Sequence, residues 1–184
     1  MIPIRDNQPS NCIPVVTYIL MGINLLIFVL QIQIGFNNEV FFYSYGLVPA
    51  KYTVPEMARH FSTGNQFFSI FSYMFLHGGF LHFIGNMWFL YIFGDNVEEH
   101  FGALRFLGFY LLSGIISGLF HFILNPVSMV PTIGASGAIA GVMGAYFLLY
   151  PKSRILTIIP IIIFPWLLKY RHLFFWGSGF LFSL

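Results

Sequence analysis

Three polar residues in otherwise apolar stretches have the types and spacing to carry out chemistry together. His82 and Asn86 are four positions apart, so they would share one helix face, while Ser136 lies in the small-residue stretch PTIGASGAIAGVMGAY. A serine hydroxyl becomes a nucleophile when a positioned base takes its proton, and the oxyanion that then forms needs aligned hydrogen-bond donors. An imidazole, a carboxamide and a hydroxyl could supply such a set. On residue chemistry alone, His82 would be the base.

Each of these residues also has a purely structural interpretation. A His and an Asn inside a membrane can form interhelical hydrogen bonds, worth about 0.6 kcal/mol on average. Gly137 and Gly141 have the spacing that lets two helices approach closely, and Gly114 and Gly118 repeat it. The stretch GASG also differs from the G-x-S-x-G elbow of soluble hydrolases, because its second glycine comes one residue early. Only the combination of the three polar residues favours catalysis.

The composition indicates a membrane protein. Charged residues make up only 8% of the 184 residues, against about 25% in soluble domains, and the mean hydropathy is +0.81. A membrane-spanning helix needs roughly 20 apolar residues. The net charge of +2 comes without a basic cluster, so the sequence predicts no site for nucleic acid or for lipid headgroups. Cys12 is the only cysteine, which excludes disulfides within the chain and thiolate metal sites. Runs without Lys, Arg, Asp or Glu cover 7–38, 60–94, 106–151 and 155–168.

These runs predict an all-α, polytopic transmembrane helix bundle forming a single domain over 1–184. We expect a fifth helix beginning near Ile155, which gives about five spans. The segment 1–14 would be an N-terminal tail, and the long loop 35–76 is too apolar for a solvated linker, so it would lie partly in the membrane interface. The four preceding helices are expected at about 15–33, 80–94, 106–124 and 134–150.

Basic residues near the ends of the predicted spans set the expected orientation. With the N-terminus in the cytoplasm, the majority of these residues fall inside. The style of the sequence is bacterial, so we expect a multi-pass protein of a bacterial inner (plasma) membrane. The inner group is Arg5, Arg105, Lys152 and Arg154, and the outer group is Lys51 and Arg59.

Three motifs, in this order and spacing, resemble those of the rhomboid intramembrane serine proteases. They are HFIGN at 82–86, GDNVEEHFG at 94–102 and GASGAIAGVMGAY at 134–146, and the resemblance covers roughly 13–168. It implies a six-helix fold that cleaves transmembrane segments of other membrane proteins with a Ser–His dyad and without a metal or cofactor. Lipid bilayer and transmembrane substrates would therefore be its partners, while the oligomeric state stays open.

The resemblance assigns roles to individual residues and changes the role of His82. Ser136 would be the nucleophile, and His82 with Asn86 would stabilise the oxyanion alongside the serine's own backbone N–H. Glu98 matches a glutamate that braces the long first loop through hydrogen bonds. The general base would be another histidine, in an A-H-x-x-G context on a sixth helix. Gly134 and Gly137 would shape the backbone of the motif, and Gly141 would be structural.

The C-terminal part departs from this pattern. The last histidine, His172, stands in KYRHLFF, which does not match A-H-x-x-G, and no sixth helix follows before Leu184. We therefore expect a truncated or frameshifted copy, with an aberrant tail over 169–184 and little proteolysis by the chain as given. The alternative is an inactive rhomboid-like protein that binds transmembrane helices. Because Ser136, His82 and Asn86 are all retained, a damaged protease is the favoured interpretation.

Overall fold

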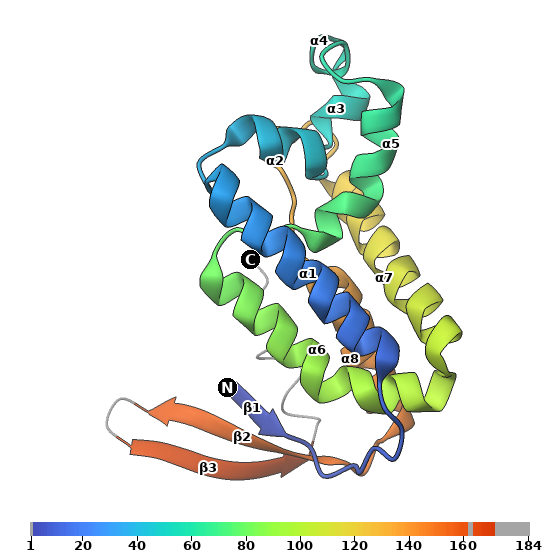
Figure 1. Cartoon of the computed structure of the whole chain (residues 1–184), viewed down its shortest axis with the longest axis vertical. Helices are drawn as coiled ribbons and strands as arrows, with labels where there is room; N and C mark the ends of the chain where they lie inside the picture. The colour runs from blue at the N-terminus through green and yellow to red at the C-terminus, as the bar shows by residue number, and fades with distance from the viewer. Residues whose placement is uncertain (1, 162–163, 172–184) are drawn as a thin grey trace.

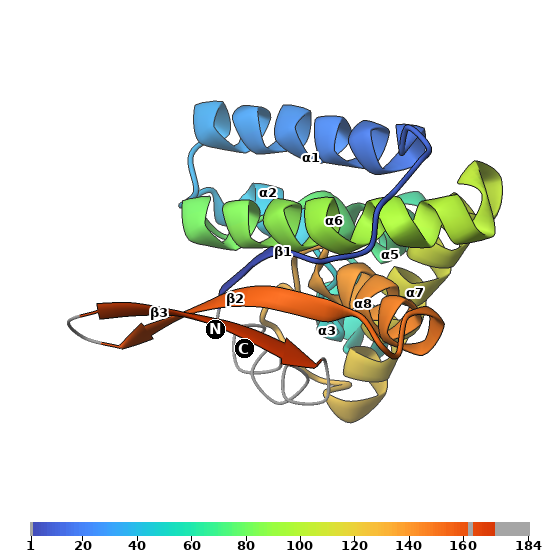
Figure 2. The same ribbon diagram turned by 90° about the horizontal axis from the view of Figure 1, so that it is seen from below.

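Four apolar helices form a bundle in the computed structural model, which describes residues 2–161 and 164–171 (Figure 1). They are α1 (Val15–Ile34), α6 (Phe80–Phe101), α7 (Ala103–Leu124) and α8 (Ser136–Leu149). Helix α6 packs between α1 and α8, and α7 packs against α8 (Figure 2). Only Gly102, at φ +78°, separates α6 from α7, and its N–H closes α6 by bonding the carbonyl of Glu98. This arrangement confirms the predicted all-α bundle.

The long loop between α1 and α6 is folded into short helices. Asn38 and Ser62 cap two of them, since each side-chain oxygen accepts a backbone N–H three residues on. The last of these helices continues toward α6 through a break, with a bend of 77° between the two arms. The elements are α2 (Glu39–Tyr45), α3 (Ala50–Thr53), α4 (Pro55–Ala58), α5 (Thr63–Ser72) and the 3-10 turn η1 (Tyr73–Phe75).

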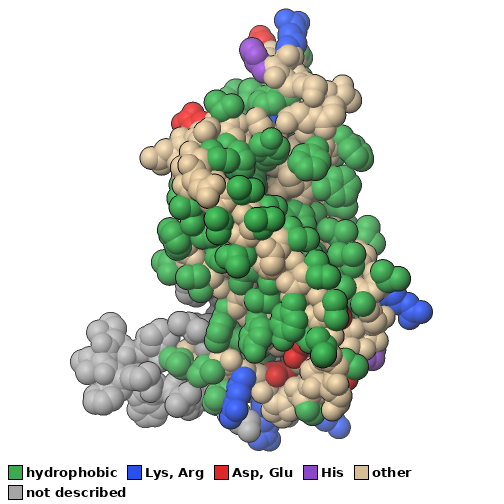
Figure 3. Space-filling model, in the orientation of Figure 1, with side chains coloured by type: hydrophobic (Ala, Val, Ile, Leu, Met, Phe, Trp, Pro, Cys, Tyr) green, Lys and Arg blue, Asp and Glu red, His purple; other side chains and the backbone are tan. Residues whose placement is uncertain are grey.

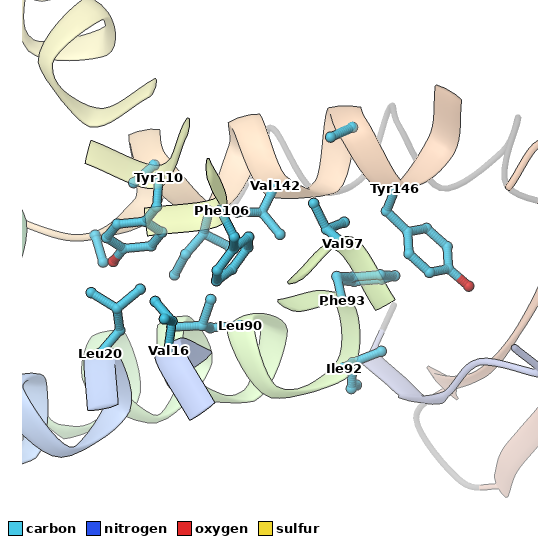
Figure 4. Packing of buried hydrophobic residues seen from close by; sticks show 14 of the residues in the cluster. Val16, Leu20, Leu90, Ile92, Phe93, Val97, Phe106, Tyr110, Val142 and Tyr146 are labelled. Atoms are coloured by element: carbon cyan, nitrogen blue, oxygen red, sulfur yellow. The ribbon is translucent and has the colours of Figure 1, made fainter. Parts of the chain in front are cut away.

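The core lies where α1, α6, α7 and α8 meet, and large side chains fill it (Figure 4). Tyr110 of α7 lies near Leu20 of α1, and Phe93 of α6 packs against Tyr146 of α8 with ring centroids 5.0 Å apart. The outside of the bundle is also apolar (Figure 3). Leu81, Leu104 and Leu148 are 84–88% exposed, which suits contact with lipid chains and not with water.

Helix lengths separate clear membrane spans from shorter elements. Within the described residues, Val15–Ile34 and Ala103–Leu124 are each long and apolar enough to cross a membrane, and the bent pair Thr63–Phe75 with Phe80–Phe101 would make a third. Helix α8 is apolar but has only 14 residues. At 1.5 Å per residue it is about 21 Å long, shorter than the roughly 30 Å hydrocarbon core.

The predicted fifth helix is wrong: the chain after Ser153 forms strands. Strands β1 (Ile2–Arg5), β2 (Arg154–Ile161) and β3 (Phe164–Arg171) make an antiparallel sheet in the order β1-β2-β3. Pro160 and Pro165 would each break the hydrogen bonding of a helix, and the Ile and Thr residues of β2 favour extended backbone. The fifth of the expected membrane spans is therefore not a helix. Residues 172–184, including His172 and most of the expected aberrant tail, lie outside the described residues.

Candidate active site

Ser136 is the first residue of α8, and the loop before it is held from two sides. Thr132 pairs with Leu47 of the long loop through two backbone hydrogen bonds of 2.8 and 3.0 Å. The N–H of Gly134 then donates to the carbonyl of Tyr73 at 2.9 Å. These bonds fix the loop before α8 relative to the long loop, so the half-buried Ser136 has a defined position.

Gly134 brings the serine loop and α6 into direct contact. Its φ of +123° lies in the region that favours glycine. A Cβ at this position would lie 2.8 Å from both Cε1 and Nε2 of His82, and 3.7 Å from Oγ of Ser136. The predicted site residues Gly134, His82 and Ser136 therefore meet at one point, and the first glycine of GASG leaves room for the imidazole.

The hydrogen bonding of His82 indicates which ring nitrogen carries the proton. The N–H of Gly78 donates to Nδ1 at 3.4 Å, a long bond that still makes Nδ1 an acceptor. In a neutral imidazole the other nitrogen, Nε2, then bears the hydrogen. The Nε2 edge of the ring, with Cε1, is also the side that faces Gly134. His82 thus presents a donor toward the serine loop, which suits binding a negative oxygen better than accepting the serine proton.

Asn86 lies one turn further along α6, and its side chain is buried. Its Nδ2 atom has no hydrogen-bond partner within the described residues, although burying an unpaired amide is costly. The Ser136 hydroxyl likewise makes no hydrogen bond in this part of the chain. An unpaired amide donor on the same helix face as His82 leaves hydrogen-bonding capacity free for a ligand oxygen.

The glycines after Ser136 allow α8 to pack closely on α7. A Cβ on Gly137 would lie 2.5 Å from the Cβ of Ser117, and one on Gly141 would lie 2.5 Å from the Cβ of Ser113. Real Cβ atoms essentially never approach so closely. These two glycines therefore serve helix packing, and the close contact fixes the direction in which α8 presents Ser136.

Glu98 is structural, but it does not brace the long loop as we predicted. Its Oε1 accepts the N–H of Val16 at 2.8 Å, and its Oε2 accepts the N–H and hydroxyl of Thr17 at 2.7 and 2.8 Å. The buried carboxylate thus caps the N-terminus of α1, where free N–H groups and the helix dipole favour negative charge. Glu98 ties α1 to the far end of the helix that carries His82 and Asn86.

His77 stands at the boundary between the long loop and α6, three residues before the helix begins. Two bonds with Gln31 of α1 clamp its backbone, from Gln31 Nε2 to the His77 carbonyl at 2.9 Å and from the His77 N–H to Gln31 Oε1 at 3.0 Å. Its buried ring lies 5.3 Å from that of His82. The roles of Gln31 and Tyr73 could not be predicted from the sequence, because no local pattern marks a residue that acts through long-range backbone contacts.

Sequence similarity to known proteins identifies the family of this chain. The Rhomboid domain family model matches residues 64–182, which is more than half of the chain. The chain belongs to the rhomboid family. Among curated proteins it is 37% identical over 82 residues to "RHOMBOID-like protein 6, mitochondrial" of Arabidopsis thaliana, covering 45% of this chain and 26% of that protein.

Two Bacillus subtilis proteins extend the similarity to bacterial rhomboids. The chain is 32% identical over 146 residues to "Rhomboid protease GluP", covering 79% of this chain and 26% of that protein. It is 32% identical over 123 residues to "Putative rhomboid protease YdcA", covering 59% of this chain and 61% of that protein. The chain thus spans between about a quarter and three-fifths of these relatives. Rhomboid membership makes it an integral membrane protein, and its relatives are both mitochondrial and bacterial.

Proposed function

We propose that this rhomboid has the site of an intramembrane serine endopeptidase, with Ser136 as the nucleophile. The observation that carries the proposal is the contact of Gly134 with both His82 and the Ser136 hydroxyl, with the unpaired amide of Asn86 one turn further along α6. Acyl transfer requires hydrogen-bond donors where a negative oxygen develops, and His82 and Asn86 on one face of α6 could supply two of them. Relatives named as rhomboid proteases support the same reaction class.

The proposed reaction divides the work between donors and a base. The Ser136 oxygen attacks a peptide carbonyl of the substrate while its proton passes to a general base, and the carbonyl oxygen takes the negative charge. His82 Nε2–H and the Asn86 amide donate to that oxygen. The C–N bond then breaks, the base gives its proton to the leaving amine, and water hydrolyses the acyl-enzyme.

The base belongs to a separate histidine in this proposal, because Nδ1 of His82 accepts the Gly78 N–H and Nε2 is therefore assigned as the donor. The described residues do not hydrogen-bond the Ser136 hydroxyl to a base, and general-base help is typically worth about 10²–10⁴-fold. We therefore propose that the chain as given cleaves slowly or not at all. The same missing contact favours a second candidate, a rhomboid-like protein that binds transmembrane helices without cutting them.

The depth of the site fits transmembrane substrates. Helix α8 is about 21 Å long, so one of its ends must lie within a roughly 30 Å hydrocarbon core. With the N-terminus of the chain in the cytoplasm, Ser136 would lie below the outer surface, and water would reach it from that side. We propose the inner membrane of a bacterium as the location, on the basis of sequence style and the two Bacillus relatives.

The decisive experiment compares two lengths of chain on a purified transmembrane substrate. The first protein is the chain as given, and the second carries an added C-terminal helix with the A-H-x-x-G histidine that the family resemblance implies. We expect cleavage by the second protein only, abolished by Ser136→Ala and unaffected by Ser117→Ala. Ser117 is a suitable control because its hydroxyl also lies near this part of α8, against Gly137, and makes no hydrogen bond in the described part.

Each possible result has a distinct meaning. Cleavage that survives Ser136→Ala would refute Ser136 as the nucleophile. Substrate binding without cleavage by the extended protein would favour the helix-binding alternative. Cleavage by the shorter chain that Ser136→Ala abolishes would show that the base lies within it and would refute the proposed missing base.

A further inference from the structure

A pocket of about 500 Å³ lies beside the N-terminal tail, where β1 pairs with β2. Tyr146, near the C-terminal end of α8, hydrogen-bonds Asp6 in the wall of this pocket, whereas Ser136 begins that helix. The pocket is therefore separated from the candidate active site by most of the length of α8. Its volume falls in the range of about 300–1,000 Å³ that is usual for small-ligand sites.

The wall of the pocket carries two cationic side chains that are not neutralised. Arg5 and Arg154 are both exposed, and neither forms an ion pair within residues 2–161 and 164–171. The one carboxylate in the wall, Asp6, is occupied elsewhere. Its Oδ2 accepts hydrogen bonds from the Tyr146 hydroxyl and, at 3.2 Å, from Nδ2 of Asn96, both on the bundle side.

The backbone that presents the two arginines is firmly anchored. Oδ1 of Asn7 accepts the N–H of Arg154 at 2.7 Å and the hydroxyl of Ser153 at 3.0 Å. Since Asn7 makes no other side-chain bond in the described part, its NH₂ group remains available as a further donor. Trp88 of α6 donates to the carbonyl of Pro3 at 2.5 Å, which fastens β1 to the bundle. The guanidinium groups therefore extend from a fixed frame, which lowers the entropic cost of binding.

We propose that this pocket binds the phosphate of an anionic membrane phospholipid, with Arg5 and Arg154 as cationic ligands. Guanidinium groups match phosphate oxygens with paired hydrogen bonds. We infer a lipid and not a free anion because exposed apolar residues follow the pocket-lining segment closely in the chain, at the start of the membrane-spanning helix α1. Ile13 and Val15, a few residues beyond the pocket, are 78% and 52% exposed, and the basic end of the molecule borders the hydrophobic belt (Figure 3). The headgroup would thus sit in the pocket with its acyl chains along α1.

The test uses the full chain in a neutral detergent, with phosphatidylglycerol or phosphatidylcholine added. Lipid retention is measured by native mass spectrometry, and the thermal unfolding midpoint is measured in parallel. We expect phosphatidylglycerol to bind and raise the midpoint. The double variant Arg5→Gln/Arg154→Gln should lose affinity by roughly tenfold or more, because each basic residue at an anionic membrane surface contributes measurably. Arg105→Gln is the control, since Arg105 is an exposed arginine at the start of α7 and does not line the pocket.

Three results would overturn the proposal. The first is that Arg105→Gln weakens binding as much as the double variant, which would show diffuse surface electrostatics. The second is that phosphatidylcholine binds as well as phosphatidylglycerol. The third is that inorganic phosphate at the same concentration raises the midpoint as much as phosphatidylglycerol, so that no anionic lipid is needed. If the double variant does not fold, Arg5→Gln alone should still weaken binding and Arg5→Lys should retain most of it. None of these readouts depends on proteolysis.

Discussion

At the scale of single residues, Gly134 allows the ring of His82 to lie against the loop that carries Ser136. The sequence predicts that these residues belong to one site, because the motifs occur in a known order. It cannot predict that a Cβ on Gly134 would collide with the His82 ring, because that contact joins residues 52 positions apart (134 − 82) across two helices. Residue chemistry alone would make the imidazole a base, and the resemblance makes it an oxyanion donor; the bond from the Gly78 N–H to Nδ1, which suits the donor role, is visible only in three dimensions.

Replacing Gly134 with alanine should damage both the fold and the site. The φ of +123° is strained for alanine, and the new methyl group would displace the His82 ring. We expect a loss of about 1–3 kcal/mol in the free energy of unfolding, measured by denaturant titration in micelles. Gly108→Ala in α7 is the control, since a Cβ there meets nothing within 4 Å, and it should stabilise by about 0.5–1 kcal/mol. Equal effects of the two substitutions would contradict the contact.

Lys51 in the long loop gives a prediction for pH. Its buried ammonium group donates to the carbonyls of Ser44 and Gly46 at 3.2 and 3.3 Å and lies 4.6 Å from the ring centroid of Phe61. Burial away from water lowers the pKa of Lys51 to about 8, from 10.5. Between these values the unfolded chain binds more protons than the folded one, so stability should rise with pH there.

The measurement compares the unfolding free energy of the protein with that of Lys51→Met at pH values from about 7 to 10. The difference between the two proteins should shift in favour of the lysine as the pH rises above about 8, and it should be flat below that value. A difference that stays constant up to about pH 10 would show that Lys51 keeps its ordinary pKa in the folded loop.

At the scale of elements, polar anchors at helix ends and small residues between helices position the site. Helix α6 runs seven residues beyond its predicted end (from 94 to 101). The prediction stopped where the charge-free run stops, whereas the helix continues through the charged residues Asp95, Glu98 and Glu99. Glu98 uses this extension to reach the first turn of α1. The short helices of the long loop were also missed, since its aromatic residues follow no regular helical spacing.

Glu98→Gln should lower stability more than the same change at its neighbour. The Glu98 carboxylate accepts three hydrogen bonds from Val16 and Thr17, whereas an amide offers one oxygen and places an NH₂ group against backbone donors. We expect a loss of about 1–3 kcal/mol by denaturant titration. Glu99→Gln is the matched control, because Glu99 accepts only the exposed N–H of Asn11 at 3.3 Å, and it should cost less than about 0.5 kcal/mol. A comparable cost for both variants would argue against the cap on α1.

Gly137→Ala tests the packing of α8 on α7. The added methyl group would overlap Ser117, so the helices must separate, at a cost of about 1–3 kcal/mol in unfolding free energy. Gly144→Ala, on the same helix with nothing within 4 Å of its Cβ, should be neutral or slightly stabilising. Adding Ser117→Gly should recover part of the loss caused by Gly137→Ala. Failure of that rescue, together with a large cost at Gly144, would contradict the close approach.

At the scale of the whole molecule, the apolar outer face of the bundle reflects its membrane setting. Charge-free runs were enough to predict the four long helices and their membrane setting, because lipid imposes a strong pattern on helix sequences. The same pattern failed after Ser153, where an equally apolar segment forms paired strands. Hydropathy alone cannot distinguish these outcomes, and the two prolines were the better guide.

The most direct test of the account is an experimental structure of the protein in a lipid nanodisc with a phosphonate at the serine. The account predicts that the phosphonyl oxygen accepts from Nε2 of His82 and Nδ2 of Asn86 at about 2.7–3.1 Å, with Ser136 beside it in one water-filled cavity. The contradicting result is a structure in which Ser136, His82 and Asn86 face separate, lipid-exposed sides, so that a single oxygen cannot contact both donors.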